Sequence, residues 1–444
     1  MTTSNRFLKN TLWIILNKVF RSIFSIFILA AITRHLGPES LGNMSYALSF
    51  TVFITALATL GLKDTLVNEI VDRKSEQGAV VGTSIVMRLL SSSVSSVVLF
   101  AILYYLDLGN DEFYWMVFVF SLSLVFQSFD MITLWYLSQL RSKVVSILTT
   151  VTFFISVLIK CLLLYLDSTV IWFAFVTMLE QVLTGLTLYI YSAKYDSFKL
   201  SFDSTLIKPL LKKSNPYIVS GLMVAIYAQT DRVMLGNILG SHSVGLYSSA
   251  LAICTMWTFL LAAIVDSSRP IIFKAHQEDY SLFALYLRRL YASVIWISLI
   301  VATVISLFSE DIIILLYGEE FLDAITVLRI VSWSTAFSFL GVAKSLWLLS
   351  ENCQNYEKWF TGIGVIVNIS LNYLLIPKWG VEGAAVATLV TQFSSNFLAQ
   401  FFMKKTKKNG WLILQAFFIY KVLSISETKA ILKRVSGYFR FYKL

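Results

Sequence analysis

Ten charged side chains in this sequence lie four or more residues inside the ends of long apolar segments, where charges are rare. Seven of them are basic and three are acidic: Lys18, Arg21, Arg88, Lys160, Arg232, Arg329 and Lys344, and Asp130, Glu180 and Asp231. A charge at the centre of a bilayer costs about 2.5–3.5 kcal/mol on insertion scales, so each needs a reason to be there. Either the side chain reaches the membrane surface or pairs inside the protein, or it lines a path for a charged solute.

The basic residues of the first and third apolar segments are the strongest candidates for such a path. Lys18 and Arg21 are three residues apart, so they are neighbours on one helix face. A polar stripe formed by Asn17, Arg21 and Ser25 overlaps this face. At about 1.5 Å per residue they lie roughly 12–17 Å into the segment, and Arg88 lies at a similar depth. We interpret Lys18, Arg21 and Arg88 as the cations of a cavity, with a buried structural pair as the alternative. Such a cavity suits phosphate groups, which arginine binds through two parallel hydrogen bonds.

Two carboxylates, Asp231 and Glu180, are candidates for binding a coupling proton or sodium ion. A structural role is the alternative for Asp231. The secondary candidates for the polar path are Arg34, Asp130, Arg232 and Lys344. Lys344 could instead reach the membrane surface. The three cysteines are scattered and the three histidines are far apart, so we expect neither a metal site nor a cofactor.

The elements that must position these residues are membrane-spanning helices. The chain has 444 residues, of which 57% are hydrophobic and 14% charged, whereas soluble domains average about 25% charged residues. Each apolar segment exceeds the roughly 17 residues needed to cross a bilayer. The sequence therefore predicts an all-α polytopic membrane protein with about twelve transmembrane helices. The expected segments are 9–32, 41–62, 80–106, 113–138, 144–166, 170–192, 216–238, 246–266, 286–308, 325–349, 357–376 and 381–403.

The distribution of lysine and arginine predicts the orientation of these helices. With the N-terminus placed in the cytoplasm, 27 of the 36 basic residues fall on the cytoplasmic side. Arg34 and Lys378 are the only basic residues in the opposite loops, and two of these loops are acidic. Because positive charge is retained on the cytoplasmic side, we expect both termini there.

An internal repeat indicates how the helices are organised. Residues 36–48 and 239–251 are identical at seven of thirteen positions with a constant offset of 203. The first block joins the first two expected segments, and the second joins the seventh and eighth. The repeat predicts two six-helix lobes of parallel topology around a central cavity, a design found in transporters.

The predicted domain boundaries follow from this repeat. We expect an N-terminal six-helix lobe, a cytoplasmic linker, a C-terminal six-helix lobe and a basic cytoplasmic tail: 1–192, 193–215, 216–403 and 404–444. Within the tail, residues 411–424 are apolar for too short a stretch to span comfortably and are surrounded by basic residues. They predict an interfacial helix on the anionic membrane surface, with a thirteenth span as the alternative.

Three sequence blocks, in order, resemble the bacterial polysaccharide exporter family, which includes the O-antigen flippases. They are Thr33–Gly42 with Leu60-Gly61-Leu62, Asp231–Gly236 with Val244–Tyr247, and Ile376–Ala385. The family belongs to the multidrug/oligosaccharidyl-lipid/polysaccharide exporter superfamily. The likeness covers nearly all of residues 1–405.

This resemblance implies a flippase rather than an enzyme. Its substrate would be a polyprenyl-diphosphate-linked oligosaccharide repeat unit, of the O-antigen (lipopolysaccharide) or capsule type. Alternating access, coupled to a proton or sodium ion, would move it from the cytoplasmic to the outer face of the inner membrane. The implied partners are this substrate, membrane lipids, a polysaccharide polymerase and a chain-length regulator.

Four other functions fit the sequence less well. An exporter of lipid II or of another lipid-linked sugar is the closest alternative, although lipid II exporters typically carry two further C-terminal spans. Multidrug exporters of the superfamily often keep a carboxylate in the first helix, which this chain lacks. A membrane-bound polysaccharide polymerase would be expected to have a long external loop with catalytic arginines. Binding of nucleic acid is not expected, because the net charge of +10 follows the membrane topology.

Overall fold

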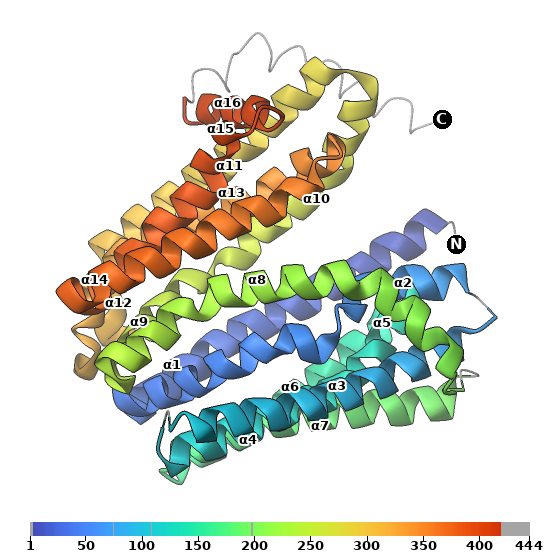
Figure 1. Ribbon diagram of the computed structural model, residues 1–444, viewed down its shortest axis with the longest axis horizontal. Coiled ribbons are helices and arrows are strands. Elements are labelled where there is room, and N and C mark those ends of the chain that lie inside the picture. The colour runs from blue at the N-terminus through green and yellow to red at the C-terminus, as the bar shows by residue number, and fades with distance from the viewer. Residues whose placement is uncertain (1–2, 74, 108, 197–198, 419–444) are drawn as a thin grey trace. The chain divides into compact units, whose positions relative to one another are not determined.

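The structure of the protein is a computed structural model that describes residues 3–73, 75–107, 109–196 and 199–418. Throughout this part of the chain the regular elements are helices, without a strand, so the expected all-α polytopic fold is confirmed. The longer helices in Figure 1 are α1 Thr3–Thr59, α2 Leu62–Asp72, α3 Gln77–Tyr105, α4 Asp111–Phe126, α5 Asp130–Ser138, α6 Ser142–Tyr165, α7 Val170–Tyr195, α8 Ile207–Leu239, α9 Ser241–Met256, α10 Thr258–Glu278, α11 Tyr280–Leu307, α12 Ser309–Leu316, α13 Ala324–Ser350, α14 Glu357–Phe393 and α16 Lys407–Ala416. The four-residue α15, Ala399–Phe402, follows a π-helical turn, Ser394–Leu398.

Two of the long helices are interrupted by a glycine. Gly37 inside α1 has φ 70° and ψ 174°, and Gly380 inside α14 has φ 59° and ψ −135°. Glycine adopts positive φ without the steric penalty of a Cβ atom. Pro38 follows the first break, at the start of a new helical stretch, where its missing N–H is tolerated. The sequence prediction placed segment boundaries at both positions.

The number of membrane crossings depends on how these interrupted helices are counted. By length and apolar composition, nine helices in the described residues could span a membrane. The number rises to ten if α9 and α10, which are bent by 41°, form one span. The nine include α1 and α14 as single helices, each of which the sequence prediction divides in two. Twelve crossings therefore remain a prediction.

The residues form two compact units, each with its own buried core. Unit 1 comprises Met1–Ala252, Glu310–Val327 and Asn368–Ala384. Unit 2 comprises Ile253–Ser309, Leu328–Val367 and Ala385–Leu444. Unit 1 contains the candidate site residues except Lys344. In this unit α1 packs against α3, α6 and α8. The two six-helix lobes bounded at 193–215 remain a prediction.

The two blocks of the internal repeat contact each other through their backbones in unit 1. A Cβ atom added to Gly42 would lie 1.8 Å from the carbonyl oxygen of Ser241, and one added to Gly245 would lie 1.9 Å from that of Pro38. Ser241 follows Pro38 by the repeat offset of 203, and Gly245 follows Gly42 by the same offset. The contact is therefore reciprocal, as it is between copies related by a twofold axis.

The helix in the basic tail is shorter than expected and begins earlier. The structure places α16 at Lys407–Ala416, whereas the sequence predicted a helix at 411–424, of which 419–424 lie outside the described residues. Ten residues extend about 15 Å, half of what a bilayer core requires. The Tyr291 hydroxyl of α11 donates a 2.7 Å hydrogen bond to Asn409, which anchors α16 in unit 2. A position at the membrane surface remains a prediction.

Candidate functional site

Unit 1 contains a cavity of about 300 Å³ whose walls carry charges of both signs. Five helices contribute to it: α1, α2, α5, α6 and α7. The lining residues are Arg21, Lys63, Asp130, Met131, Thr133, Leu134, Leu137, Thr149, Glu180, Gln181 and Thr184. Besides the charged groups, threonine hydroxyls and a glutamine amide offer hydrogen bonds to a neutral ligand.

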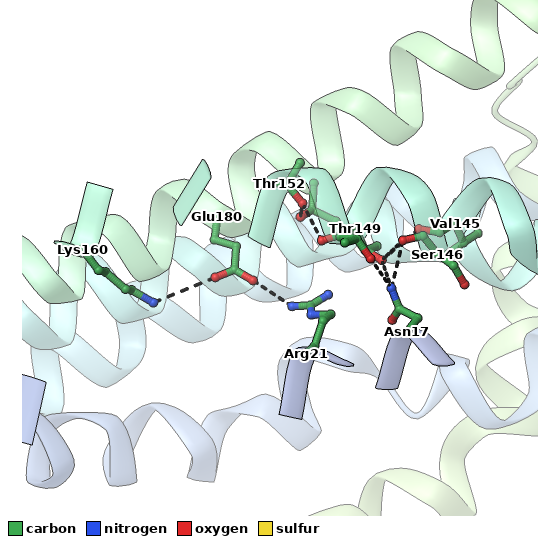
Figure 2. Close-up of polar contacts among 10 residues, drawn as sticks. Asn17, Arg21, Val145, Ser146, Thr149, Thr152, Lys160 and Glu180 are labelled. Atoms are coloured by element: carbon green, nitrogen blue, oxygen red, sulfur yellow. Dashed lines mark hydrogen bonds and ion pairs between the residues drawn. The ribbon is translucent and has the colours of Figure 1, made fainter. Parts of the chain in front are cut away.

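Arg21 is held in this cavity by a carboxylate and an aromatic ring. Its Nη2 donates a 2.8 Å hydrogen bond to Oε1 of Glu180 on α7, and its guanidinium carbon lies 4.9 Å from the centre of the Phe153 ring. The other carboxylate oxygen of Glu180 lies 4.0 Å from Nζ of Lys160. Figure 2 shows Glu180 between these two basic side chains. Because Arg21 keeps 31% of its side chain exposed and Glu180 only 10%, the arginine is the more accessible partner.

Asn17 fixes the register of α1 against α6, one helical turn before Arg21. Its side-chain amide donates to the carbonyl oxygen of Ser146 at 2.9 Å (Figure 2) and to the Thr150 hydroxyl at 2.6 Å. The polar stripe expected from the sequence therefore faces protein at Asn17 and Arg21. These bonds limit how far Arg21 can move along α6.

Asp130 interacts with three basic groups of the site. Arg88, Lys63 and Arg21 all lie close enough to Asp130 to interact with it electrostatically. Arg88 is 3% exposed, and its Nε finds no hydrogen-bond partner among the described residues. We call the six charged residues of this region the Arg21 cluster: Arg21, Lys63, Arg88, Lys160, Asp130 and Glu180. Four basic and two acidic members leave an excess of two positive charges.

Two predicted residues lie apart from this cluster. Lys18 is exposed and does not line the cavity, so the structure does not bring it together with Arg21. Arg34 is also exposed and lies near Gly318, whose added Cβ would be 3.7 Å from the arginine Nε. A role in the substrate cavity remains a prediction for Lys18 and Arg34.

Asp231 lies in a second polar site of unit 1, formed by neutral groups. Its side chain is buried, with 5% of the residue exposed. One carboxylate oxygen accepts a 2.7 Å hydrogen bond from the Tyr247 hydroxyl, and the other accepts bonds of 2.8 and 2.6 Å from the amides of Asn368 and Asn372. The neighbouring Arg232 donates to other groups, Ser248 at 3.0 Å and Gln229 at 2.7 Å. We call Asp231, Tyr247, Asn368 and Asn372 the Asp231 site.

Lys344 is buried in unit 2 and does not reach a membrane surface. Its residue is 0% exposed, and its Nζ lies 3.1 Å from Oδ1 of Asn396 and 3.5 Å from a carboxylate oxygen of Glu357. The same nitrogen lies 4.4 Å from the centre of the Phe360 ring. Gly341 leaves room for Asn396, because an added Cβ would be 2.5 Å from its Oδ1. Lys344 is therefore paired inside the protein.

Sequence reasoning missed four members of these sites, Lys63, Tyr247, Asn368 and Asn372. Lys63 was assigned to a connection, but it belongs to α2 and lines the cavity. Asn368 and Asn372 are neutral, so a search for charges passes over them. Two asparagines one helical turn apart inside an apolar segment were the available signal. Among the described residues, no group of three or more His, Cys, Asp or Glu side chains could hold a metal ion.

The family of the chain follows from a comparison with known protein families. Residues 7–276 match the family described as "Polysaccharide biosynthesis protein". The chain belongs to this family. The match includes the whole Arg21 cluster and, from the Asp231 site, Asp231 and Tyr247.

Two individual proteins with similar sequences differ in how much of the chain they cover. The capsular polysaccharide biosynthesis protein CapF of Staphylococcus aureus is 21% identical over 416 residues, which cover 89% of this chain and 99% of CapF. The probable low-salt glycan biosynthesis flippase Agl15 of Haloferax volcanii is 24% identical over 250 residues, 54% of this chain and 51% of Agl15.

Solved structures show the fold of this family member. The inward closed conformation of the lipid II flippase MurJ superimposes with a TM-score of 0.68 at 14% identity, covering 93% of this chain and 92% of that chain. An inward-facing multidrug transporter of the MATE family gives a TM-score of 0.66 at 16% identity, covering 87% and 96%. The polysaccharide biosynthesis protein described here therefore has the fold of the multidrug/oligosaccharidyl-lipid/polysaccharide exporter superfamily.

Proposed function

We propose that this protein is a flippase for a polyprenyl-diphosphate-linked oligosaccharide. It moves the repeat unit from the cytoplasmic to the outer face of the bacterial inner membrane by alternating access, with both termini in the cytoplasm. Membership of the polysaccharide biosynthesis family and the likeness to a glycan flippase support a transporter rather than an enzyme. Since the capsular relative covers nearly the whole chain, capsule type is favoured over O-antigen.

The observation that carries this proposal is the Arg21 cluster. Its excess of two positive charges matches the about two negative charges of a diphosphate bridging a lipid and a sugar. Arg21 is the accessible member, and a guanidinium can bind a phosphate through two hydrogen bonds. The low dielectric of the membrane interior strengthens this attraction and penalises an unpaired diphosphate.

The size of the cavity limits which part of the substrate it holds. A volume of about 300 Å³ is at the lower end of ordinary ligand pockets, so it suits the diphosphate and the start of the sugar. The hydroxyls of Thr133, Thr149 and Thr184 and the amide of Gln181 line the same space and can hydrogen-bond the sugar. Asn17 and Phe153 act as positioning residues for Arg21.

The Asp231 site is the proposed site of the coupling ion, a proton or sodium. Its oxygens come from a carboxylate, two amides and a phenol, the donor types that hard cations prefer. Both asparagines direct their amide nitrogens at Asp231, and a half-turn of either amide would present an oxygen instead. A bound cation would favour that turn. Glu180 is the alternative coupling carboxylate, but it already has two cationic partners.

A lipid II exporter, or an exporter of another lipid-linked sugar, is the second candidate. Its cargo carries the same diphosphate, so the Arg21 cluster fits both. A multidrug exporter is disfavoured because an excess of positive charge repels cationic drugs. In the proposed function, a polysaccharide polymerase and a chain-length regulator would act on the repeat units after their export.

Substitutions of Arg21 test the proposed function. In a host strain that lacks its own exporter, Arg21→Ala should abolish surface polysaccharide while the protein stays in the membrane at normal levels. Arg21→Lys should restore part of the export, because the charge returns without the planar fork. Arg329→Ala, which changes an exposed arginine of unit 2, is the matched control and should export normally.

Arg21→Leu separates a role in binding from a structural role. Full export by this variant, normalised to inserted protein, would show that Arg21 does not bind the cargo. Loss of export at an unchanged protein level and an unchanged unfolding temperature supports the proposal.

A further inference from the structure

Glu180 carries a negative charge, which disfavours the binding of a diphosphate at this site. Its carboxylate bonds to the accessible arginine of the cavity at 2.8 Å and lines the cavity itself. Glu180 accepts a hydrogen bond from one edge of the Arg21 guanidinium, so a cargo phosphate that binds this edge displaces it. The proposed function gives this carboxylate only an alternative role in ion coupling, although it lowers the positive charge of the site by one.

The surrounding groups show what happens to Glu180 after such a displacement. Lys160 lies 4.0 Å from its second oxygen, so the carboxylate keeps an ionic partner when Arg21 turns to a ligand. Lys160 is largely buried, with 14% of its side chain exposed. The other charged groups of the cavity, Asp130 and Lys63, lie on α5 and α2. The exchange therefore leaves no charge stranded, which would be costly in the membrane interior.

The energetic balance of this exchange depends on the charge of the ligand. A lipid with a single phosphate group carries about one negative charge. When such a group takes the place of Glu180 on Arg21, one anion replaces another, so little Coulomb energy is gained. A diphosphate carries about two, so one phosphate replaces Glu180 and the second meets the remaining positive charge of the cluster.

We propose that Glu180 is a specificity-determining residue that makes the cavity reject ordinary phospholipids and accept diphosphate-linked cargo. The inference rests on the proposed function and deepens it. Specificity of this kind is a difference between two affinities, obtained by penalising the wrong ligand. The penalty matters here because phospholipids with one phosphate form the membrane around the protein.

The experiment compares two soluble probes that differ by one phosphate. Geranyl-diphospho-glucose and geranyl-phospho-glucose share the lipid and the sugar. Their dissociation constants are measured by isothermal titration calorimetry on the full-length protein in nanodiscs of uncharged lipid. The variants are Glu180→Gln and the matched control Glu310→Gln, which removes one exposed carboxylate of α12 and changes the net charge equally.

The wild-type protein and Glu310→Gln should bind the diphosphate probe at least about tenfold more tightly than the monophosphate probe. Glu180→Gln should gain affinity for the monophosphate probe and reduce this ratio about fivefold or more, without losing affinity for the diphosphate probe. An unchanged ratio overturns the inference alone. Weaker diphosphate binding by Glu180→Gln at an unchanged unfolding temperature also overturns it, since Glu180 would then position Arg21. If the wild type binds neither probe, the proposed function fails as well.

Discussion

The Arg21 cluster and the Asp231 site each place a carboxylate inside unit 1, but they surround it differently. Glu180 is in contact with two basic side chains, Arg21 and Lys160. Asp231 accepts hydrogen bonds from a phenol and two amides, which carry no net charge. The first carboxylate is paired with charged side chains, whereas the second accepts hydrogen bonds from neutral ones, and Arg232 lies close enough to interact with it electrostatically.

This difference predicts which kind of ion each site attracts. Around Glu180 positive charge remains in excess, so the region attracts an anion and uses its carboxylate to select among anions. Around Asp231 the hydrogen bonds come from a phenol and two amides, whose oxygens could also bind a cation, so we expect this site to attract one. Two carboxylates in one fold could thus serve opposite ligands, according to which groups donate their hydrogen bonds.

The strongest challenge to this comparison is the removal of the negative charge from the Asp231 site. Asp231→Asn keeps the size of the side chain but removes the attraction for a cation. We expect export to fall by about tenfold or more, with loss of its dependence on sodium or on the proton gradient. Surface polysaccharide, measured per inserted protein across both ion gradients, tests this. Export that stays normal and ion-dependent would contradict a coupling role for Asp231.

A smaller effect is expected from Asn372, which supports Asp231 without charge. Asn372→Leu removes one amide and one potential oxygen ligand, so the ion concentration for half-maximal export should rise about tenfold, as for outer ligands of metal sites. Maximal export should stay within about twofold. Asn237→Leu, an exposed asparagine on α8, is the control and should leave that concentration unchanged. An equal change in both variants would argue against the assignment.

The smallest effect on export is expected at Lys344, a buried cation that lines neither site. Its ammonium lies among Asn396, Glu357 and Phe360 in unit 2. Lys344→Met removes a buried ammonium, and its carboxylate partner Glu357 is half exposed and can be solvated by water, so we expect little loss of stability. Export should stay within about twofold and the unfolding temperature should not fall. A large loss of export without unfolding would place Lys344 among the functional residues.

The sequence predicted the kinds of residues in these sites better than their partners. Arg21, Asp130, Glu180 and Asp231 stand out because a charge in an apolar segment is costly wherever it lies. The pairing of Arg21 with Glu180 joins residues 159 apart, and it depends on how α1 packs near α7, which local pattern does not specify. The neutral hydrogen-bond partners in these sites do not stand out in the sequence in this way.

The helix boundaries show the same limit. The apolar segments predicted boundaries that contain Gly37 and Gly380, and the structure breaks the helices there because glycine adopts positive φ through local backbone geometry. Lys63 was misplaced because α2 begins at Leu62, directly after a turn, so the residue that looked like part of a loop lies on a helix.

The reciprocal contact at Gly42 and Gly245 has a mechanical consequence for transport. Peptide groups, rather than side chains, set the distance between the two chain segments there, and peptide groups have no rotamers with which to yield. The helices that meet at this crossing can therefore change their angle, but they cannot draw closer. Because Gly37 interrupts α1 between Arg21 and this crossing, the Arg21 end of α1 can turn at that break while the spacing at the crossing is kept.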